Sequence, residues 1–193
     1  KGRLLDIGCA FGFLLAEARK RGWTGTGVDL SPHAAQYARE ELGLEIWVGL
    51  LREIALPPEE FQAVVMDDVI EHTTDPMAEF REIHRLLKPG GALLLHTPNI
   101  DSRWHFIMRK AWFHLKPEEH LFYFSPATIA PMLEKAGFKI SYIRSCRKAT
   151  NVDYIIGVLK KYSPSAGAVL HRISRLFPKL AQKPFWFPGG GME

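Results

Sequence analysis

The feature that most constrains the fold is a short segment near the start of the chain, where a strand pattern, a glycine turn and a helix pattern follow one another. Residues 3–8 predict a buried strand, and from Phe11 to Arg21 apolar residues recur at helical spacing until Gly22. Gly8 and Gly12 lie at the junction, where glycine allows a tight turn and a close approach of the backbone to a ligand. This order is typical of one unit of an α/β sheet.

The same alternation continues over the next hundred residues. Helices are predicted to begin where a Ser or Asp cap is followed by Pro, and the helix after Asp75 is predicted to end before Lys88-Pro89-Gly90-Gly91. The predicted strands are 24–29, 45–48, 61–66, 92–96 and 139–145, and the cap-and-proline pairs are Ser31-Pro32, Asp75-Pro76 and Ser125-Pro126. We therefore predict an α/β fold, a doubly wound, mostly parallel sheet with helices on both faces.

The chain length of 193 residues suits a single domain. We expect residues 1–150 to form a ligand-binding core, and residues 151–193 to form a basic amphipathic extension of the same domain. Within the core, residues 98–125 interrupt the alternation and are rich in aromatic residues and histidines. Long segments of this kind often act as lids or recognition elements, so we expect this one to cover the substrate.

Charge is distributed unevenly along the chain, whose net charge is +4. Residues 144–193 carry nine Lys or Arg against two acids, whereas the remainder carries sixteen against nineteen. Such a basic segment either contacts an anionic membrane surface or is an ordinary solvated helix face. No apolar run approaches the roughly 20 residues of a membrane span, no signal peptide is apparent, and Cys9 and Cys146 are too few for a disulfide framework. We expect a cytoplasmic protein, with peripheral contact at the inner face of the membrane as the alternative; nothing indicates its oligomeric state.

The ligand is suggested by acids at the carboxyl ends of the predicted strands, where sheets of this type bind ligands. The loop from Asp6 to Gly12 lacks the G-x-G-x-x-G spacing of a dinucleotide site. Asp6 would repel a pyrophosphate but suits a cationic ligand, and Asp29 can accept hydrogen bonds from both hydroxyls of a ribose. These residues together favour a cationic nucleoside.

At this point the sequence resembles the class I S-adenosylmethionine-dependent methyltransferases. The resemblance depends on the motifs Leu4 to Gly12, Val28 to Ser31, Asp68 to His72 with Asp75-Pro76, Leu86 to Gly91, and Thr97 to Asn99. The run from Pro117 to Ser125 resembles the branch that contains ubiquinone-type O-methyltransferases and sugar methyltransferases. The resemblance implies a Rossmann-like sheet, S-adenosylmethionine as methyl donor, S-adenosylhomocysteine as product, and a small hydroxylated acceptor such as a sugar, a glycolipid precursor or a quinol.

The resemblance also implies a set of cofactor-binding residues. They are Asp6, Gly8, Cys9, Ala10 and Gly12 around the methionine part, Asp29 and Leu30 at the ribose, and Asp67 and Asp68 facing the methyl donor or substrate. Two positions depart from the family pattern: Ala10 stands where a third glycine is usual, and Gly49-Leu50-Leu51 stands where Gly-Asp would place an acid near the adenine. We also expect the family's helix before the first strand and its last strand to be missing.

For the chemical step we consider His120 the general base and Glu119 the residue that assists it. Imidazole suits removal of a hydroxyl proton near neutral pH, and both residues lie in the expected lid. The structural alternative is that Glu119-His120 only anchors the next helix. A divalent metal on Asp67, Asp68, Glu71 and His72 is not expected, because four ligands within one turn rarely converge.

Two other functions remain open on the sequence. The first is a non-catalytic cofactor-binding module that kept the methyltransferase fold. The second is a nucleic-acid methyltransferase, which the basic segment would permit. The chain has Asp67-Asp68-Val69-Ile70 in place of the Asn/Asp-Pro-Pro-Tyr/Phe typical of enzymes that methylate amino groups of bases, so no nucleic-acid partner is expected.

Overall fold

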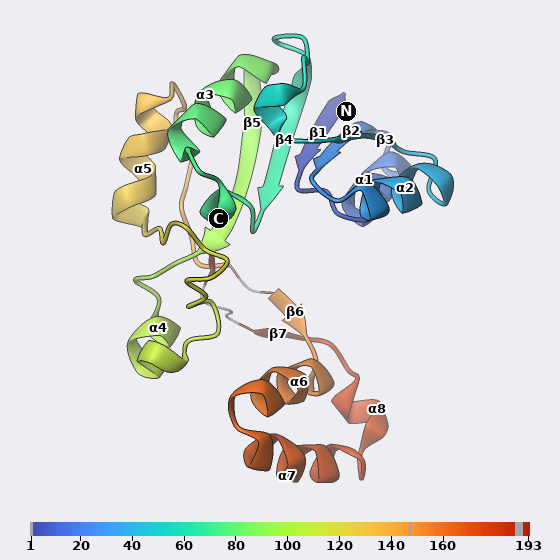
Figure 1. The fold of residues 1–193 in the computed structure, drawn as a ribbon, viewed down its shortest axis with the longest axis vertical. Coiled ribbons are helices and arrows are strands. Elements are labelled where there is room, and N and C mark those ends of the chain that lie inside the picture. Colours follow the sequence, from blue (N-terminus) through green and yellow to red (C-terminus); the bar gives the residue numbers. More distant parts are fainter. Residues whose placement is uncertain (1, 147, 188–190) are drawn as a thin grey trace.

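A six-stranded, mostly parallel sheet is the centre of the computed structural model, which describes residues 2–146, 148–187 and 191–193 (Figure 1). Its strands are β1 (Arg3–Ile7), β2 (Thr24–Asp29), β3 (Glu45–Val48), β4 (Phe61–Asp67), β5 (Leu87–Pro98) and β8 (Gly191–Met192). They lie in the order β3-β2-β1-β4-β5-β8, and only β8 is antiparallel to its neighbour. The predicted fold class is confirmed.

Helices cover both faces of the sheet, and the first three of them connect parallel strands. They are α1 (Phe13–Lys20), α2 (Pro32–Glu40), α3 (Pro76–Leu86), α4 (Arg103–Met108) and α5 (Pro126–Lys135), with short 3₁₀ turns η1 (Leu51–Glu53), η2 (Ile70–His72) and η3 (Arg109–Ala111). Two of the three predicted caps form through their side chains: Ser31 accepts from the amide of Ala34, and Asp75 accepts from the amide of Ala78. At Ser125, which precedes α5, the backbone amide instead donates to the hydroxyl of Thr128. Each cap satisfies a backbone donor that the first turn of a helix leaves unpaired.

Two hydrophobic cores lie on opposite faces of the sheet because neighbouring strand residues point in opposite directions. Leu4 packs with Leu15 of α1 and Ala35 of α2. Leu5, its neighbour in β1, belongs to the other core, which includes Phe80 of α3. The sheet is therefore buried on both sides, as expected for parallel strands.

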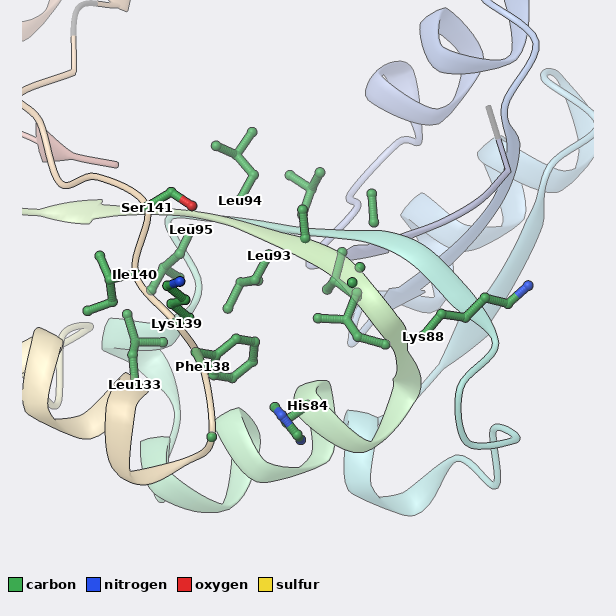
Figure 2. Close-up of a pocket in the computed structure, with 18 of the residues that line it drawn as sticks. His84, Lys88, Leu93, Leu94, Leu95, Leu133, Phe138, Lys139, Ile140 and Ser141 are labelled. Carbon is green, nitrogen blue, oxygen red and sulfur yellow. The ribbon is translucent and has the colours of Figure 1, made fainter.

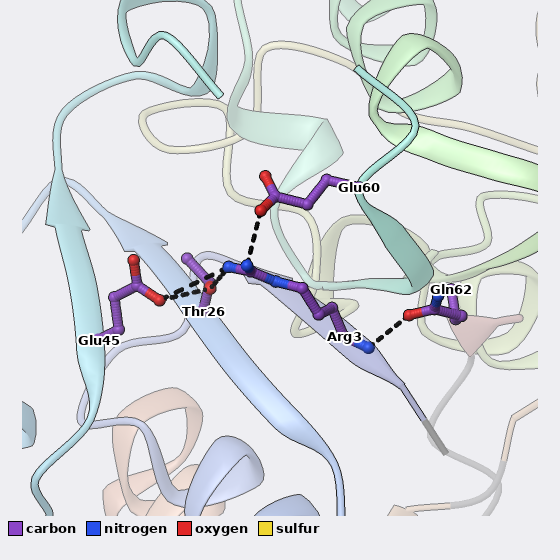
Figure 3. A network of polar contacts seen from close by, with 5 residues as sticks. All are labelled: Arg3, Thr26, Glu45, Glu60 and Gln62. Atoms are coloured by element: carbon purple, nitrogen blue, oxygen red, sulfur yellow. Dashed lines mark hydrogen bonds and ion pairs between the residues drawn. The ribbon is translucent and has the colours of Figure 1, made fainter. Parts of the chain in front are cut away.

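An ion-pair network ties together the amino ends of the strands (Figure 3). The Arg3 guanidinium lies 2.7 Å from Oε1 of Glu60 and 3.8 Å from Oε2 of Glu45. Thr26 donates to Glu45 at 2.9 Å, and the backbone amide of Arg3 donates to the side chain of Gln62. These polar side chains contact one another and link neighbouring strands, at the end of the sheet opposite to the strand-end acids.

The predicted strand over residues 139–145 is wrong. Only Ser145 of this segment forms a bridge, to Met192, because β8 occupies the position beside Thr97 and Pro98 at the edge of β5. Elsewhere a cavity of about 1110 Å³ lies beside β5. It is lined by apolar residues of β5, α5 and the following segment, which Figure 2 shows as Leu93, Leu95, Leu133, Phe138 and Ile140. None of the strand-end acids lines this cavity.

The C-terminal part forms a small helical unit on a two-stranded antiparallel sheet. The strands are β6 (Lys148–Thr150) and β7 (Phe185–Phe187), and between them lie α6 (Val152–Tyr162), α7 (Pro164–Ser174) and α8 (Pro178–Ala181). In Figure 1 this unit and α4 lie below the carboxyl ends of β4 and β5. In the part of the chain that the structure describes, no helix has the length and apolar character needed to cross a bilayer.

Candidate functional site

Three carboxylates meet at the carboxyl ends of adjacent parallel strands. Asp6 lies in β1, Asp29 ends β2, and Asp67 ends β4. Burial, together with the negative charges of Asp67 and Asp29, raises the pKa of Asp6 to about 7. Desolvation and like charges both disfavour the ionised form of Asp6, so a positively charged ligand at this edge of the sheet would be bound favourably.

The glycine loop between β1 and α1 is held against β2. The amides of Gly8 and Cys9 both donate to the carbonyl of Val28, at 2.8 and 3.2 Å. Gly8 has a φ of 74°, and a Cβ atom there would lie 2.3 Å from a methyl group of Val69. Both the left-handed backbone and the close approach therefore require glycine at this position.

The two other special positions of this loop also have positive φ. Gly12 adopts a φ of 75° as the N-cap of α1, and Ala10 adopts a φ of 45°. The left-handed conformation costs an L-residue roughly 1–2 kcal/mol, which explains why glycine is usual where Ala10 stands. The loop keeps its shape despite this departure, because the amide of Ala10 donates to Oδ2 of Asp29 at 2.7 Å.

The Asp29 carboxylate is fixed by two backbone donors. Besides the amide of Ala10 on Oδ2, the amide of Ser31 donates to Oδ1 at 2.8 Å. Each carboxylate oxygen has a second lone pair, so Asp29 can still accept from a diol. The adjacent Leu30 side chain is 65% exposed. The predicted ribose position thus has an oriented acceptor beside an apolar surface.

Cys9 is buried within the same loop. Burial, together with the negative charges of Asp6 and Asp29, raises the pKa of its thiol to about 12. The side chain therefore remains a neutral thiol and is not a nucleophile.

Asp67 and Asp68 share a histidine that the sequence analysis did not single out. Nδ1 of His96, in β5, lies 2.7 Å from Oδ1 of Asp67 and 2.9 Å from Oδ1 of Asp68. Asp68 has a φ of 53°, and its amide donates to the carbonyl of His96. The turn after β4 is thus fastened to β5. The pairing of β4 with β5 sets His96 opposite Asp67 in register, a juxtaposition visible only once the sheet order is known.

A second polar group forms where η2 meets the segment before α5. His120 is buried, and its ring lies with its centroid 4.8 Å from that of His72. The buried carboxylate of Glu71 lies beside both rings. The Glu119 carboxylate instead contacts Lys116, whose Nζ donates to it at 2.8 Å. The structure thus groups His120 with two residues of η2, Glu71 and His72, rather than bringing these two together with Asp67 and Asp68.

Comparison with known proteins agrees with this geometry. The family model for a methyltransferase domain matches residues 1–143. A ubiquinone biosynthesis O-methyltransferase of Pseudomonas entomophila is 35% identical over 111 residues, which cover 54% of this chain and 48% of that protein. One of Aeromonas salmonicida is 27% identical over 150 residues, 72% of this chain and 63% of that protein. The chain spans about half the length of the Pseudomonas relatives it matches.

Solved structures of low sequence identity share the fold. A putative methyltransferase of Bacillus halodurans superposes with a TM-score of 0.65 at 20% identity, over 80% of this chain and 70% of that one. An S-adenosylmethionine-dependent methyltransferase of Thermotoga maritima, described as a possible histamine N-methyltransferase, superposes with a TM-score of 0.63 at 19% identity. The match covers 100% of this chain and 80% of that one. The family model, the sheet order and the glycine loop with its strand-end acids agree, and the chain belongs to the class I S-adenosylmethionine-dependent methyltransferases.

Proposed function

We propose that this chain transfers a methyl group from S-adenosylmethionine to a hydroxyl oxygen of a small acceptor such as a sugar, a glycolipid precursor or a quinol. The observation that carries the proposal is the convergence of Asp6, Asp29 and Asp67 beside a glycine loop at the carboxyl ends of the parallel strands. The oxygen acceptor is supported by relatives named as ubiquinone biosynthesis O-methyltransferases.

The donor set fits S-adenosylmethionine in three respects. Burial and the negative charges of Asp67 and Asp29 together raise the pKa of Asp6 to about 7, and a sulfonium and an ammonium group would offset this penalty on the ionised form. The free lone pairs of Asp29 suit the two ribose hydroxyls. Close approach of the ligand to the backbone is possible at Gly8 and Gly12, because neither has a side chain.

The adenine end lacks the acid that is usual after the third strand, but another carboxylate lies near that position. The backbone amide of Leu50 donates to Oε2 of Glu53 at 3.4 Å, which places this carboxylate against the loop that follows β3. We assign to Glu53 the contact with the adenine amino group. The remaining members of the proposed cofactor site are Cys9, Ala10, Leu30, Asp67 and Asp68.

Bound S-adenosylmethionine supplies an electrophilic methyl group, so the protein chiefly has to align the acceptor and exclude water. We assign removal of the acceptor proton to His120. Burial lowers the pKa of His120, and the charges of His72 and Lys116 lower it further, so the imidazole is unprotonated near neutral pH. The negative charge of Glu119 raises this pKa and so opposes the effect of burial, in keeping with an assisting role.

Methyl transfer from tritium-labelled S-adenosylmethionine to a panel of quinols, phenols and sugars tests the proposal. We expect label in an extractable small molecule, and loss of transfer in Asp29→Ala but not in Glu41→Gln, which changes an exposed carboxylate on another surface. Binding of the cofactor without labelling of any acceptor would favour the non-catalytic module. Label in added RNA or DNA would favour the nucleic-acid methyltransferase.

A further inference from the structure

The group formed by Glu71, His72 and His120 has the composition and spacing of a metal site. One ligand atom from each residue lies within 4.8 Å of the others. Glu71 and His72 belong to η2, while His120 comes from the segment before α5. The amides of Leu121 and Phe122 donate to the backbone carbonyl of Glu71, at 2.8 and 3.2 Å. Hydrogen bonds of the main chain therefore hold the two segments together, and the three side chains are brought to one point before any ligand binds.

The Glu71 side chain is only half satisfied within the residues that the structure describes. It is 1% exposed, and Oε2 accepts from the hydroxyl of Thr97 at 2.9 Å. Oε1 is buried and has no hydrogen-bond partner among the residues that the structure describes. A carboxylate oxygen without a donor or a cation is costly inside a protein. The position of Oε1 next to two imidazoles points to a cation as the missing partner.

Each imidazole offers a nitrogen lone pair. Nδ1 of His72 lies 2.8 Å from the carbonyl oxygen of Glu119. A carbonyl only accepts, so Nδ1 carries the hydrogen and Nε2 of His72 carries the lone pair. Nδ1 of His120 is buried and has no hydrogen-bond partner among the described residues. Histidine ligands of metals commonly donate their other ring nitrogen to a carbonyl in this way, which fixes the tautomer and the ring orientation.

We propose that Glu71, His72 and His120 bind one divalent transition-metal ion, with Zn²⁺ as the best match. One carboxylate and two imidazoles are a ligand set of catalytic zinc sites, which keep a further coordination position open. Imidazole nitrogens also disfavour Mg²⁺, which prefers oxygen ligands. The neighbouring group of Asp67, Asp68 and His96 is a poorer candidate, because Nδ1 of His96 already lies within 2.9 Å of a carboxylate oxygen of each aspartate.

The open position gives the ion a place in the reaction, and this step rests on the proposed function. An acceptor hydroxyl bound to Zn²⁺ would lose its proton to water near neutral pH, as zinc-bound water does. Its oxygen would then form a bond to the methyl group while the bond from that methyl group to sulfur breaks and S-adenosylhomocysteine leaves. With the ion bound, the lone pair of His120 is on the metal. The ion would then take over the role assigned above to His120 acting alone.

Titration of the metal-stripped protein with ZnCl₂ in a calorimeter tests the site without cofactor or acceptor. We expect one equivalent of tight binding, and much weaker binding of MgCl₂. Glu71→Gln and His120→Gln should each weaken zinc binding at least about 100-fold, and Thr97→Val about 10- to 100-fold, the usual effect of removing an outer-shell partner. His171→Ala, which removes an exposed histidine of α7, is the matched control and should bind like the wild type.

Folding of every variant is checked by circular dichroism. His72→Gln keeps the test decisive if a buried variant fails to fold, because the His72 side chain is exposed. Absence of stoichiometric binding, or equal binding by the wild type and His72→Gln, would overturn the proposal. Failure of the metal site is distinguishable from failure of the proposed function, because transfer of label in the presence of EDTA would leave the methyltransferase proposal intact.

Discussion

Replacement of Asp6 by Asn should stabilise the folded protein and weaken the cofactor site. The pKa of Asp6 is about 7 in the fold, against 3.8 for an exposed aspartate. Because the pKa of Asp6 is raised in the fold, the stability that this side chain contributes is fully present below about pH 3.8. That contribution is lost as the pH rises through about 7. At pH 8 the ionised carboxylate costs about 4 kcal/mol, since each pKa unit corresponds to about 1.4 kcal/mol.

The side-chain amide introduced by Asp6→Asn would remove this cost while keeping the shape of the side chain. We therefore expect the free energy of unfolding of Asp6→Asn to exceed that of the wild type by about 4 kcal/mol at pH 8, falling to about 2 kcal/mol at pH 5, where the wild-type carboxyl is largely protonated in the fold. Unfolding in urea, followed by tryptophan fluorescence at both pH values, measures the difference. Glu41→Gln is the control and should give nearly the wild-type value at each pH.

The same substitution should reduce affinity for S-adenosylmethionine. In the wild type, binding should strengthen between pH 6 and pH 8 as Asp6 ionises, whereas Asp6→Asn should bind weakly and lose this pH dependence. Calorimetry at the two pH values measures both effects. The reasoning from burial and charge crowding would be refuted if Asp6→Asn were less stable than the wild type at pH 8. It would also be refuted if the variant exceeded the wild-type free energy of unfolding by the same amount at pH 5 and at pH 8.

Two further outcomes are expected. Asp29→Ala should weaken binding of S-adenosylhomocysteine by about 2 kcal/mol in a calorimeter, because a charged acceptor of two hydroxyls is lost; an unchanged affinity would remove Asp29 from the ribose site. The stretch from Arg144 to Lys183 should contact anionic membranes, because Val169, Ile173 and Leu176 are exposed near Arg172 on and just after α7. Co-sedimentation with vesicles should rise with anionic lipid and fall with salt, and binding that ignores both would make this segment ordinary solvated surface.

Local sequence patterns were sufficient to predict most strands of the sheet. The predicted strands 24–29 and 45–48 coincide with β2 and β3, and the Ser31-Pro32 and Asp75-Pro76 pairs begin α2 and α3. These elements depend on interactions within a few residues, namely alternating apolar positions and side-chain caps. The prediction failed at residues 139–145, where β8 pairs with the end of β5, only Ser145 forms a bridge to Met192, and residues 139–143 line a cavity beside β5.

The sequence by itself determined the family, the parallel sheet and the acids at its carboxyl edge, since each follows from short motifs in a fixed order. Only the tertiary structure decided how buried Asp6 is, that His96 lies between Asp67 and Asp68, and that His120 joins Glu71 and His72. Those contacts connect residues that are far apart in the sequence. They depend on sheet register and on hydrogen bonds between loops, and no local pattern of apolar residues, caps or turns encodes either of these.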